Sequence, residues 1–410
     1  MTILTVEQAL EELLSKIKRL GSESVYLSEA VGRVLAKDVV ADISLPSFDN
    51  SAVDGYAVIA SDTANASPNH ASVLQQIETI YAGANPEKKI TNGFTSKIMT
   101  GAPLPEGANA VVMLEDSTES ENNLIEIHTQ VQAGQGVRKE GEDIQLASTP
   151  LCEGTLLHAG EIGILAALGQ PKVNVVRRPR VAVVSTGDEV VEISQGVIPP
   201  KGKIRNSNRY LLSALTLQTG AALQSARHLP DELEPTMRGL KQCVESGADV
   251  IVVAGGVSVG EKDYVRPALE KLGKLDIWKV NMKPGKPIAI GSIGDTLFFG
   301  LPGNPVSAQV TWELFVRPAL LKMMGRSNSQ RMQVEALLES NISHSQGRTE
   351  YVRGKVRWRN GSFHVVPTGE QGSGMMHSLQ DMNCLIVIPA DETNVEKGST
   401  VTVMILGDYL

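Results

Sequence analysis

Residues 173–325 alternate between short apolar runs and amphipathic segments, and this rhythm limits the possible folds more than any other feature of the chain. The apolar runs predict strands, and the segments between them predict helices. Such alternation implies right-handed βαβ units and a doubly wound, mostly parallel α/β sheet that is covered on both faces. The expected strands are residues 181–185, 222–227, 249–253 and 296–299, and the expected helices are residues 209–217, 234–246, 264–272 and 306–324.

Four loops rich in glycine, proline or small polar residues interrupt this alternation. They are STGDE (185–189), GGVSVGEKDY (255–264), KVNMKPGKP (279–287) and GLPGNP (300–305). At the carboxyl ends of parallel strands, backbone N–H groups and helix N-termini collect anionic ligands. One such loop alone would be a tight turn, but four on one sheet predict a shared anion-binding rim. None matches G-x-G-x-x-G or a Walker A sequence, so ordinary dinucleotide and P-loop sites lose their main support.

Small residues in these loops are candidates for contacts with a ligand. Gly255 and Gly256 lack a Cβ atom, so a ligand can approach their backbone closely, and Ser258 precedes a predicted helix. Ser185 lies at a strand end. For any one of these loops, a structural turn between a strand and a helix is the alternative interpretation.

The loop at residues 279–287 carries the candidate cationic groups. Lys279, Lys283 and Lys286 lie there, and Pro284 and Pro287 stiffen the loop. A rigid cationic cluster suits a phosphate or another oxyanion. Scattered surface lysines are the alternative, although two prolines are costly in an unspecialised turn.

Composition excludes several classes of function. A net charge of −8 argues against a general nucleic-acid or acidic-membrane surface, so an anionic substrate needs a local cationic site. Cys152, Cys243 and Cys384 form no C-x-x-C pair, which fits a reducing compartment. No run of about 18 apolar residues occurs, and the N-terminal segment is an amphipathic helix capped by Thr5. We therefore expect a cytoplasmic protein with neither nucleic acid nor membrane as a partner.

The rest of the chain predicts three further domains around the α/β domain of residues 177–327. Residues 47–141 show short apolar runs broken by Gly, Pro and Asn, which indicates a β-rich insert. The flanking residues 1–46 and 142–176 then form one discontinuous linking domain. Residues 328–410 predict a C-terminal β-barrel-like domain with a hairpin turn at Asn360-Gly361. In that domain Arg353, Lys355, Arg357 and Arg359 share one strand face, which we interpret as solvated.

Acidic residues supply candidate metal ligands. The insert carries Asp54, Thr100 and Arg138, each within a distinctive sequence motif. Asp143 lies just after the end of the insert. The acids Asp54, Asp143, Glu189, Asp231 and Asp263 suit Mg²⁺, which bridges a few carboxylates and substrate phosphates. Each acid alone could instead cap a turn. No histidine pair has metal-ligand spacing and no serine lies in G-x-S-x-G, so zinc hydrolysis and acyl transfer have little support.

Eight motifs, in order and over essentially the whole chain, carry a family resemblance. They are FDNSAVDGYA, MTGAPLPEGANAVVM, GEDI, STGDE, AGGVSVGEKDY, KPGKP, GLPGNPVSA and GEQGSGMMHSL. Together they resemble the molybdopterin molybdenumtransferase family, the bacterial relatives of the gephyrin C-terminal region. The resemblance implies a four-domain, elongated homodimer, a Mg²⁺ cofactor, and a reaction in which adenylylated molybdopterin and molybdate give molybdenum cofactor and AMP.

The resemblance also implies roles for single residues. The family's functional acids fall on Asp54, Asp143, Glu189 and Asp263, with Asp231 a looser match, and its basic, polar and shaping partners fall on Thr100, Arg138, Lys279, Lys283, Ser373, Pro302 and Pro305. We expect catalytic roles for Asp54, Asp143, Glu189, Asp263, Lys279 and Lys283, and metal binding by Glu189, Asp231 and Asp263. The chain departs from the family where we expect a run of arginines: Arg138 is followed by Lys139 and Glu140.

The acids of the insert lie in a different domain from the loops of the α/β sheet. In a dimer of this family they would come from the other subunit, so the resemblance implies a composite active site and a possible contact with the upstream molybdopterin adenylyltransferase. Two alternatives stay open. One is a tungsten-inserting paralogue, because molybdate and tungstate have nearly the same size and charge. The other is a gephyrin-like binding or scaffold protein without turnover.

Overall fold

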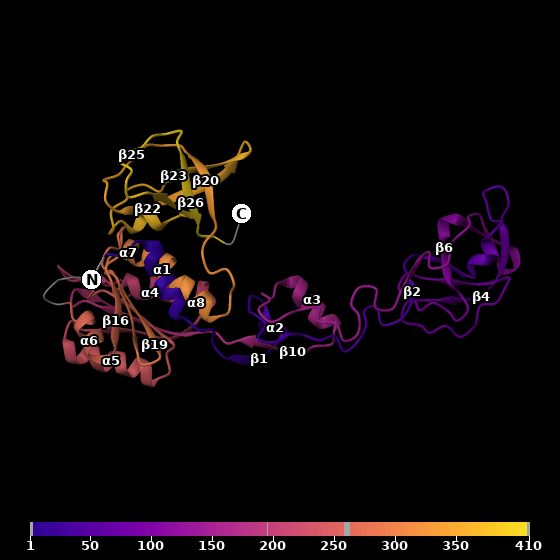
Figure 1. Cartoon of the computed structure of the whole chain (residues 1–410), viewed down its shortest axis with the longest axis horizontal. Helices are drawn as coiled ribbons and strands as arrows, with labels where there is room; N and C mark the ends of the chain where they lie inside the picture. Colours follow the sequence, from indigo (N-terminus) through magenta and orange to yellow (C-terminus); the bar gives the residue numbers. More distant parts are fainter. Residues whose placement is uncertain (1–2, 195, 258–262, 408–410) are drawn as a thin grey trace. The chain divides into compact units, whose positions relative to one another are not determined.

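The computed structural model describes residues 3–194, 196–257 and 263–407, which form two compact units (Figure 1). Unit 1 consists of Met1–Ser24, Gly32–Val34 and Asn174–Leu410, and unit 2 of Val25–Val31 and Leu35–Val173. The chain passes between the units within two paired strands, β1 (Ser22–Tyr26) and β10 (Lys172–Val176).

Unit 1 contains the predicted doubly wound sheet, with strand order β14-β11-β15-β19-β18-β16. Its parallel strands are β14 (Ala222–Leu229), β11 (Arg180–Thr186), β15 (Val250–Ala254) and β19 (Thr296–Leu301). The four expected strands and the mostly parallel arrangement are therefore confirmed. Two antiparallel strands that the pattern did not predict, β18 (Ala289–Ile293) and β16 (Lys274–Trp278), extend one edge.

Helices cover both faces of this sheet (Figure 1). The helices on one face are α1 (Val6–Lys16), α4 (Ser207–Gln218), α7 (Pro305–Thr311) and α8 (Arg317–Met323), and those on the other are α5 (Leu233–Glu245) and α6 (Val265–Leu272). The helix expected over residues 306–324 contains a π-helical turn, η4 (Trp312–Val316), between α7 and α8. The short strands β12 (Val190–Val191) and β13 (Ile204–Arg205) pair beside the sheet's carboxyl ends.

The first helix lies in unit 1, whereas the sequence pattern placed it in the linking domain. Thr5 forms a capping box with Gln8, as the sequence predicts. Val6, Ala9 and Leu13 are buried in the same apolar cluster as the sheet and α8. The assignment differs because the periodicity shows that α1 has an apolar stripe but does not show which surface covers that stripe.

Unit 2 contains a six-stranded sheet with order β6-β3-β5-β4-β8-β7. Its strands are β3 (Gly55–Val58), β4 (Ser72–Ile80), β5 (Phe94–Ile98), β6 (Ala110–Met113), β7 (Ser117–Ser120) and β8 (Leu124–Ile127). The longest strand, β4, has the sequence SVLQQIETI, which is largely polar and contains no continuous apolar run. Unit 2 also contains the strand pair β2 (Asn50–Ser51) and β9 (Val137–Arg138) and the helices α2 (Leu27–Ala30) and α3 (Ala159–Ala167). Backbone hydrogen bonds from Leu35 to Thr155 and from Val39 to Leu151 join the segments that flank the insert.

The C-terminal part of unit 1 is a closed barrel. Its strands are β20 (Gln333–Leu338), β22 (Thr349–Arg359), β23 (Ser362–Pro367), β24 (Cys384–Ile388) and β26 (Thr400–Ile405), and β22 closes it by pairing with both β23 and β24. The short strand β17 (Met282–Lys283) joins β22, and β21 (Ile342–Ser343) pairs with β25 (Asn394–Val395). Asn360 and Gly361 have φ values of 51° and 80°, so the predicted hairpin turn is confirmed.

One prediction about the barrel is wrong. The strand face that carries Arg353 is not solvated along its whole length, because Arg353 is only 1% exposed, whereas Arg357 and Arg359 are exposed. The physical reason is that β22 is long enough to run from a covered to an uncovered region of the barrel. Alternation identifies residues that share a face, but it does not show where along the strand that face becomes covered.

Candidate functional site

A cavity of about 570 Å³ lies at the carboxyl ends of β11, β15 and β19 in unit 1. The loops after these strands and the start of α4 line it. Eight residues that the sequence analysis selected are in its wall: Ser185, Glu189, Asp231, Gly255, Gly256, Asp263, Pro302 and Pro305. The expected convergence of loops on one rim of the sheet is therefore present in the structure.

The other residues that the sequence predicts to be functional do not line this cavity in the part of the chain that the structure describes. Lys279, Lys283 and Ser373 are in unit 1 but are not among the described residues that line the cavity. Asp54, Thr100, Arg138 and Asp143 belong to unit 2. Ser258 lies outside the described residues.

Ser185 is held in the cavity wall by a buried asparagine. Asn206 Nδ2 donates to Ser185 Oγ at 2.8 Å and to Glu192 Oε1 at 2.9 Å. Asn206 Oδ1 accepts from the Arg209 N–H at 3.2 Å and so caps helix α4. Asn206 is 1% exposed and was not selected from the sequence. An asparagine a few residues before the helix predicted at residue 209 is the signal of an N-cap, and it could have identified Asn206 and the helix start at Ser207.

The acidic side of the cavity is held by two aspartates that bond each other's backbone. The Asp188 N–H donates to Asp231 Oδ2 at 3.0 Å, and the Asp231 N–H donates to Asp188 Oδ1 at 3.2 Å. This exchange ties the loop after β11 to the loop after β14. Glu189 and Asp263 complete the acidic lining.

Two glycines allow the backbone after β15 to pass close to the neighbouring loop. Gly255 has a φ of +100° and Gly256 a φ of +65°. A Cβ atom on Gly255 would lie 2.8 Å from Thr186 Oγ1, and one on Gly256 would lie 2.6 Å from Val265 Cγ2. Any side chain here would therefore push the β11 loop and helix α6 away from the cavity.

Two buried oxygen atoms in the wall have no hydrogen-bond partner among the described residues. They are Thr186 Oγ1 and Asn208 Oδ1. The Asn208 Nδ2 atom donates to Gly303 O at 2.6 Å, which orients the amide oxygen. Buried polar atoms are normally satisfied, so these two are suited to a ligand.

The donor set of this wall fits a magnesium ion. Carboxylate, hydroxyl and amide oxygens are the ligands that Mg²⁺ prefers, and Mg²⁺ commonly takes its remaining ligands from water and substrate phosphates. Within the described ranges, no three His, Cys, Asp or Glu side chains form a complete metal cage. A magnesium site here would thus depend on oxygens from the substrate.

The basic loop after β16 is attached to the barrel. Strand β17 pairs with β22 so that Lys283 lies opposite Glu350, and Lys283 Nζ is 2.9 Å from Glu350 Oε1. Lys279 has a φ of 71°, and its N–H donates to Ile288 O at 3.2 Å. This loop ends at Pro287, which lines the cavity.

A barrel loop also reaches the rim of the cavity. Asn304, in the cavity wall, donates through Nδ2 to Ser373 Oγ at 2.9 Å. The buried Arg353 shapes this loop by donating to the carbonyl oxygens of Glu370 and Gly372, each at 3.2 Å. Burial lowers the pKa of Arg353 to about 10, and the negative charge of Glu350 acts in the opposite direction.

In unit 2, Asp54 is bound by Thr100. The Thr100 N–H and the Thr100 hydroxyl each donate to Asp54 Oδ1 at 2.7 Å. These bonds, first the backbone one and then the side-chain one, lower the pKa of Asp54, so it is a carboxylate at neutral pH. The Asp143 N–H donates to Leu45 O at 3.0 Å.

Residues 138–140, where Lys139 and Glu140 replace the arginines expected for the family, also make defined contacts. Arg138 pairs with Asn50 through strands β9 and β2. Lys139 Nζ lies 2.6 Å from Asp49 Oδ2, and the Glu140 N–H donates to Asp49 Oδ1 at 2.9 Å. The Lys139 bond, followed by that of Glu140, lowers the pKa of Asp49. Lys139 therefore stabilises the loop that follows Arg138.

Three family models match consecutive parts of the chain. They describe the MoeA N-terminal region (domain I and II) at residues 4–169, a probable molybdopterin binding domain at residues 182–322, and the MoeA C-terminal region (domain IV) at residues 335–406. The molybdopterin molybdenumtransferase of Haemophilus influenzae is 35% identical over 410 residues and covers 98% of both chains. The chain belongs to the molybdopterin molybdenumtransferase family. The enzyme of that name from Bacillus subtilis is also 35% identical, over 99% of this chain and 94% of its own.

Solved structures of the family agree with the fold. A molybdopterin biosynthesis MoeA protein from Pyrococcus horikoshii has a TM-score of 0.83 at 31% identity, and the match covers 100% of both chains. A second structure from strain OT3 of this organism has a TM-score of 0.84 and covers 98% of this chain. The multidomain α/β and β architecture expected from the resemblance is thus confirmed.

Proposed function

We propose that this chain catalyses the Mg²⁺-dependent insertion of molybdate into adenylylated molybdopterin, giving molybdenum cofactor and AMP. The observation that carries the proposal is the cavity in unit 1. Acids, glycine backbones and two oxygens without a partner among the described residues meet there beside a basic loop. Full-length relatives of the molybdopterin molybdenumtransferase family support it. The names of these relatives describe a transferase of molybdenum that acts with molybdopterin.

We assign the acidic wall to the magnesium ion and the phosphates. Glu189, Asp231 and Asp263 would hold Mg²⁺ together with oxygens of the substrate. When bound, the ion would neutralise the phosphoryl oxygens as the bond to AMP breaks. The close backbone approach at Gly255 and Gly256 leaves room for the nucleotide part of the substrate.

We assign the basic loop and the barrel loop to the oxyanion. Molybdate is a tetrahedral dianion, and an ammonium group such as that of Lys283 suits it, as does a hydroxyl such as that of Ser373. Lys279 lies in the same loop. Pro302 and Pro305 shape the turn that carries Asn304 and thereby the contact to Ser373.

We further propose that the active enzyme is a cytoplasmic homodimer with a composite active site. Asp54, Thr100, Arg138 and Asp143 in unit 2 of one subunit would complete the cavity of the other. The upstream molybdopterin adenylyltransferase would supply the substrate. No helix in the described part of the chain is long and apolar enough to cross a membrane.

The proposal is tested by replacing one acid of the cavity. Asp263→Asn removes the carboxylate charge at nearly constant shape, and we expect AMP release to fall by at least about 100-fold. The assay measures AMP from adenylylated molybdopterin, with and without molybdate. Asp295→Asn, in the exposed turn between β18 and β19, is the matched control and should turn over normally. Normal AMP release by Asp263→Asn would overturn the assignment.

A competition between molybdate and tungstate separates the molybdenum enzyme from a tungsten-inserting paralogue. Both anions have the size and charge that the site requires, so the enzyme's preference is given by the ratio of its kcat/KM values for molybdate and tungstate. A higher value for tungstate would indicate the tungsten-inserting paralogue.

A further inference from the structure

A buried carboxylate of the barrel contacts the basic loop. Glu350, in strand β22, is 5% exposed, and its Oε1 atom lies 2.9 Å from Lys283 Nζ. The Lys283 side chain remains 41% exposed, so its ammonium group contacts a buried partner on one side and solvent on the other. We propose that Glu350, supported by His344, is a positioning residue that holds Lys283 at the oxyanion end of the active site. This inference rests on the proposed function of Lys283.

The backbone brings the two residues together in a defined register. Strand β17 pairs in parallel with β22, with Met282 opposite Thr349 and Lys283 opposite Glu350. The pairing connects a loop of the α/β domain to the first residues of a barrel strand. A shift of this register would carry Lys283 away from its carboxylate.

His344 fixes the second oxygen of the carboxylate. Its Nδ1 atom lies 2.6 Å from Glu350 Oε2, and its side chain is 0% exposed. A carboxylate can only accept, so the hydrogen lies on Nδ1. His344 follows β21. Its backbone N–H donates to Thr393 O at 2.8 Å, which anchors the residue to the barrel.

The Nε2 atom of His344 is buried and has no partner in the described part of the chain, so the polar contact of this ring is the one that Nδ1 makes to Glu350. Lys283 is the lysine at contact distance from Glu350, because its Nζ atom lies 2.9 Å from Glu350 Oε1. A carboxylate this buried needs such a partner, so each group keeps the other in place.

Arg353 lies in the same strand as Glu350, β22. Burial lowers the pKa of Arg353, and the negative charge of Glu350 acts in the opposite direction. Arg353 in turn holds the carbonyl oxygens of the loop that contains Ser373.

Glu350→Gln tests the proposal, because it removes the charge and keeps the shape. We expect the KM for molybdate to rise about ten-fold, with kcat at saturating molybdate within about two-fold. The control is Glu313→Gln, an equally buried carboxylate of unit 1 that is 3.0 Å from Arg331 Nε and makes no contact with Lys283. Glu313→Gln should leave the KM unchanged. If Glu350→Gln does not fold, Glu350→Asp is the second variant. It keeps the charge, but its shorter side chain moves the carboxylate away from Lys283, so the KM should also rise.

A second readout does not depend on activity. Mass spectrometry after brief treatment with an amine-reactive reagent should show Lys283 modified about three-fold faster in Glu350→Gln than in the wild type. His344→Leu should reproduce both effects, and His344→Asn, which keeps a donor near the Nδ1 position, should restore wild-type behaviour.

The outcomes separate the two proposals. A wild-type protein whose turnover does not depend on molybdate would overturn the proposed function and this inference with it. A molybdate-dependent wild type with an unchanged KM and labelling rate in Glu350→Gln would overturn the inference alone. A lowered KM would also overturn it, because Glu350 would then compete with the oxyanion instead of positioning Lys283.

Discussion

The glycine that follows β15 shows how a single residue shapes the cavity. Gly255 combines a positive φ with a backbone path that leaves no space for a side chain beside Thr186. Its N–H donates to Leu301 O at 3.0 Å, so the segment cannot simply move outward. The positive φ and the lack of space both require glycine here.

Gly255→Ala should lower the free energy of unfolding by at least about 1 kcal/mol more than Gly202→Ala does. Gly202 has a φ of +84° with open space around it, so its replacement measures the cost of the backbone conformation alone. Urea unfolding of both variants gives the comparison. If both variants lost the same free energy of unfolding, the loop after β11 would have to move without energetic cost to make room for a Cβ atom.

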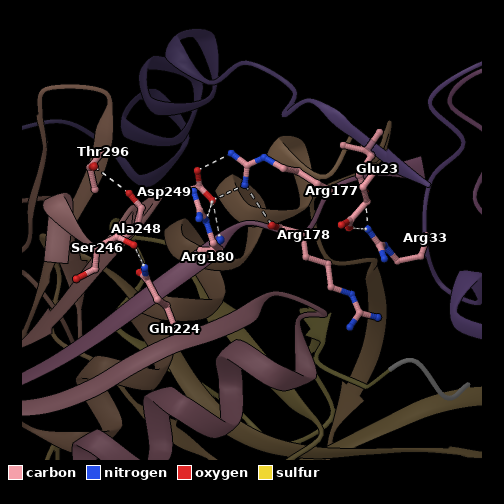
Figure 2. A network of polar contacts seen from close by, with 11 residues as sticks. Glu23, Arg33, Arg177, Arg178, Arg180, Gln224, Ser246, Ala248, Asp249 and Thr296 are labelled. Atoms are coloured by element: carbon pink, nitrogen blue, oxygen red, sulfur yellow. Dashed lines mark hydrogen bonds and ion pairs between the residues drawn. The ribbon is translucent and has the colours of Figure 1, made fainter. Parts of the chain in front are cut away.

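At the scale of secondary-structure elements, an arginine–aspartate pair fastens β10 to the parallel sheet (Figure 2). Arg177, just after β10, donates from both terminal nitrogens to the two carboxylate oxygens of Asp249, each at 2.6 Å. The Arg180 N–H adds a bond to Asp249 Oδ2 at 2.8 Å. Nearby, Arg33 contacts Glu23 and donates to Val176 O at 2.8 Å. These contacts order the amino ends of the strands whose carboxyl ends form the cavity.

The pair also makes stability depend on pH. Burial alone would raise the pKa of Asp249, but hydrogen bonds from Arg177 and Arg180 outweigh it and lower the pKa below its ordinary value of 3.8. A lowered folded-state pKa contributes stability that is complete above the ordinary value and is lost as the pH falls through the folded value.

Arg177→Gln should therefore lower the free energy of unfolding by about 2 kcal/mol at pH 7. The difference from the wild type should shrink below pH 3.8 as Asp249 becomes protonated. Denaturant unfolding at pH 7 and pH 3 measures both values. Arg178→Gln is the control, because the Arg178 side chain is exposed and points away from Asp249 (Figure 2). If the difference in free energy of unfolding between the variant and the wild type did not depend on pH, packing of the aliphatic part of the Arg177 side chain, rather than its charge, would supply the stability.

At the scale of the whole molecule, the proposed composite site makes activity a property of two chains. Asp54→Asn in unit 2 and Glu189→Gln in unit 1 should each abolish turnover alone. In a randomly mixed dimer population half of the dimers are heterodimers, and each then has one intact site, so co-expression should restore about a quarter of the wild-type activity. AMP release from the co-expressed chains, purified through one tag that both chains carry so that all dimers are retained, measures this. A mixture without activity would place all the functional residues in one subunit's own site or exclude the dimer.

The order of elements in the α/β domain follows from short-range pattern. The strands at residues 180–186 and 250–254 and the cap at Thr5 were predictable, because burial and capping depend on residues within a few positions of each other. The same pattern placed Gly255 and Glu189 at strand ends, where parallel topology brings them to one rim. The edge strand β16 and the largely polar strand β4 were missed. The sequence of β16, KLDIW, is only five residues long, and that of β4, SVLQQIETI, alternates weakly.

The sequence by itself determined the fold class, the family and the rim of loops that lines the cavity, since these depend on local periodicity and on motifs with fixed spacing. Only the tertiary structure placed α1 against the sheet, buried Arg353, and joined Lys283 to Glu350 and Asn304 to Ser373. Those contacts link residues far apart along the chain. Alternation indicates that a face or a charge needs a partner, but the choice of partner is made by how whole elements pack.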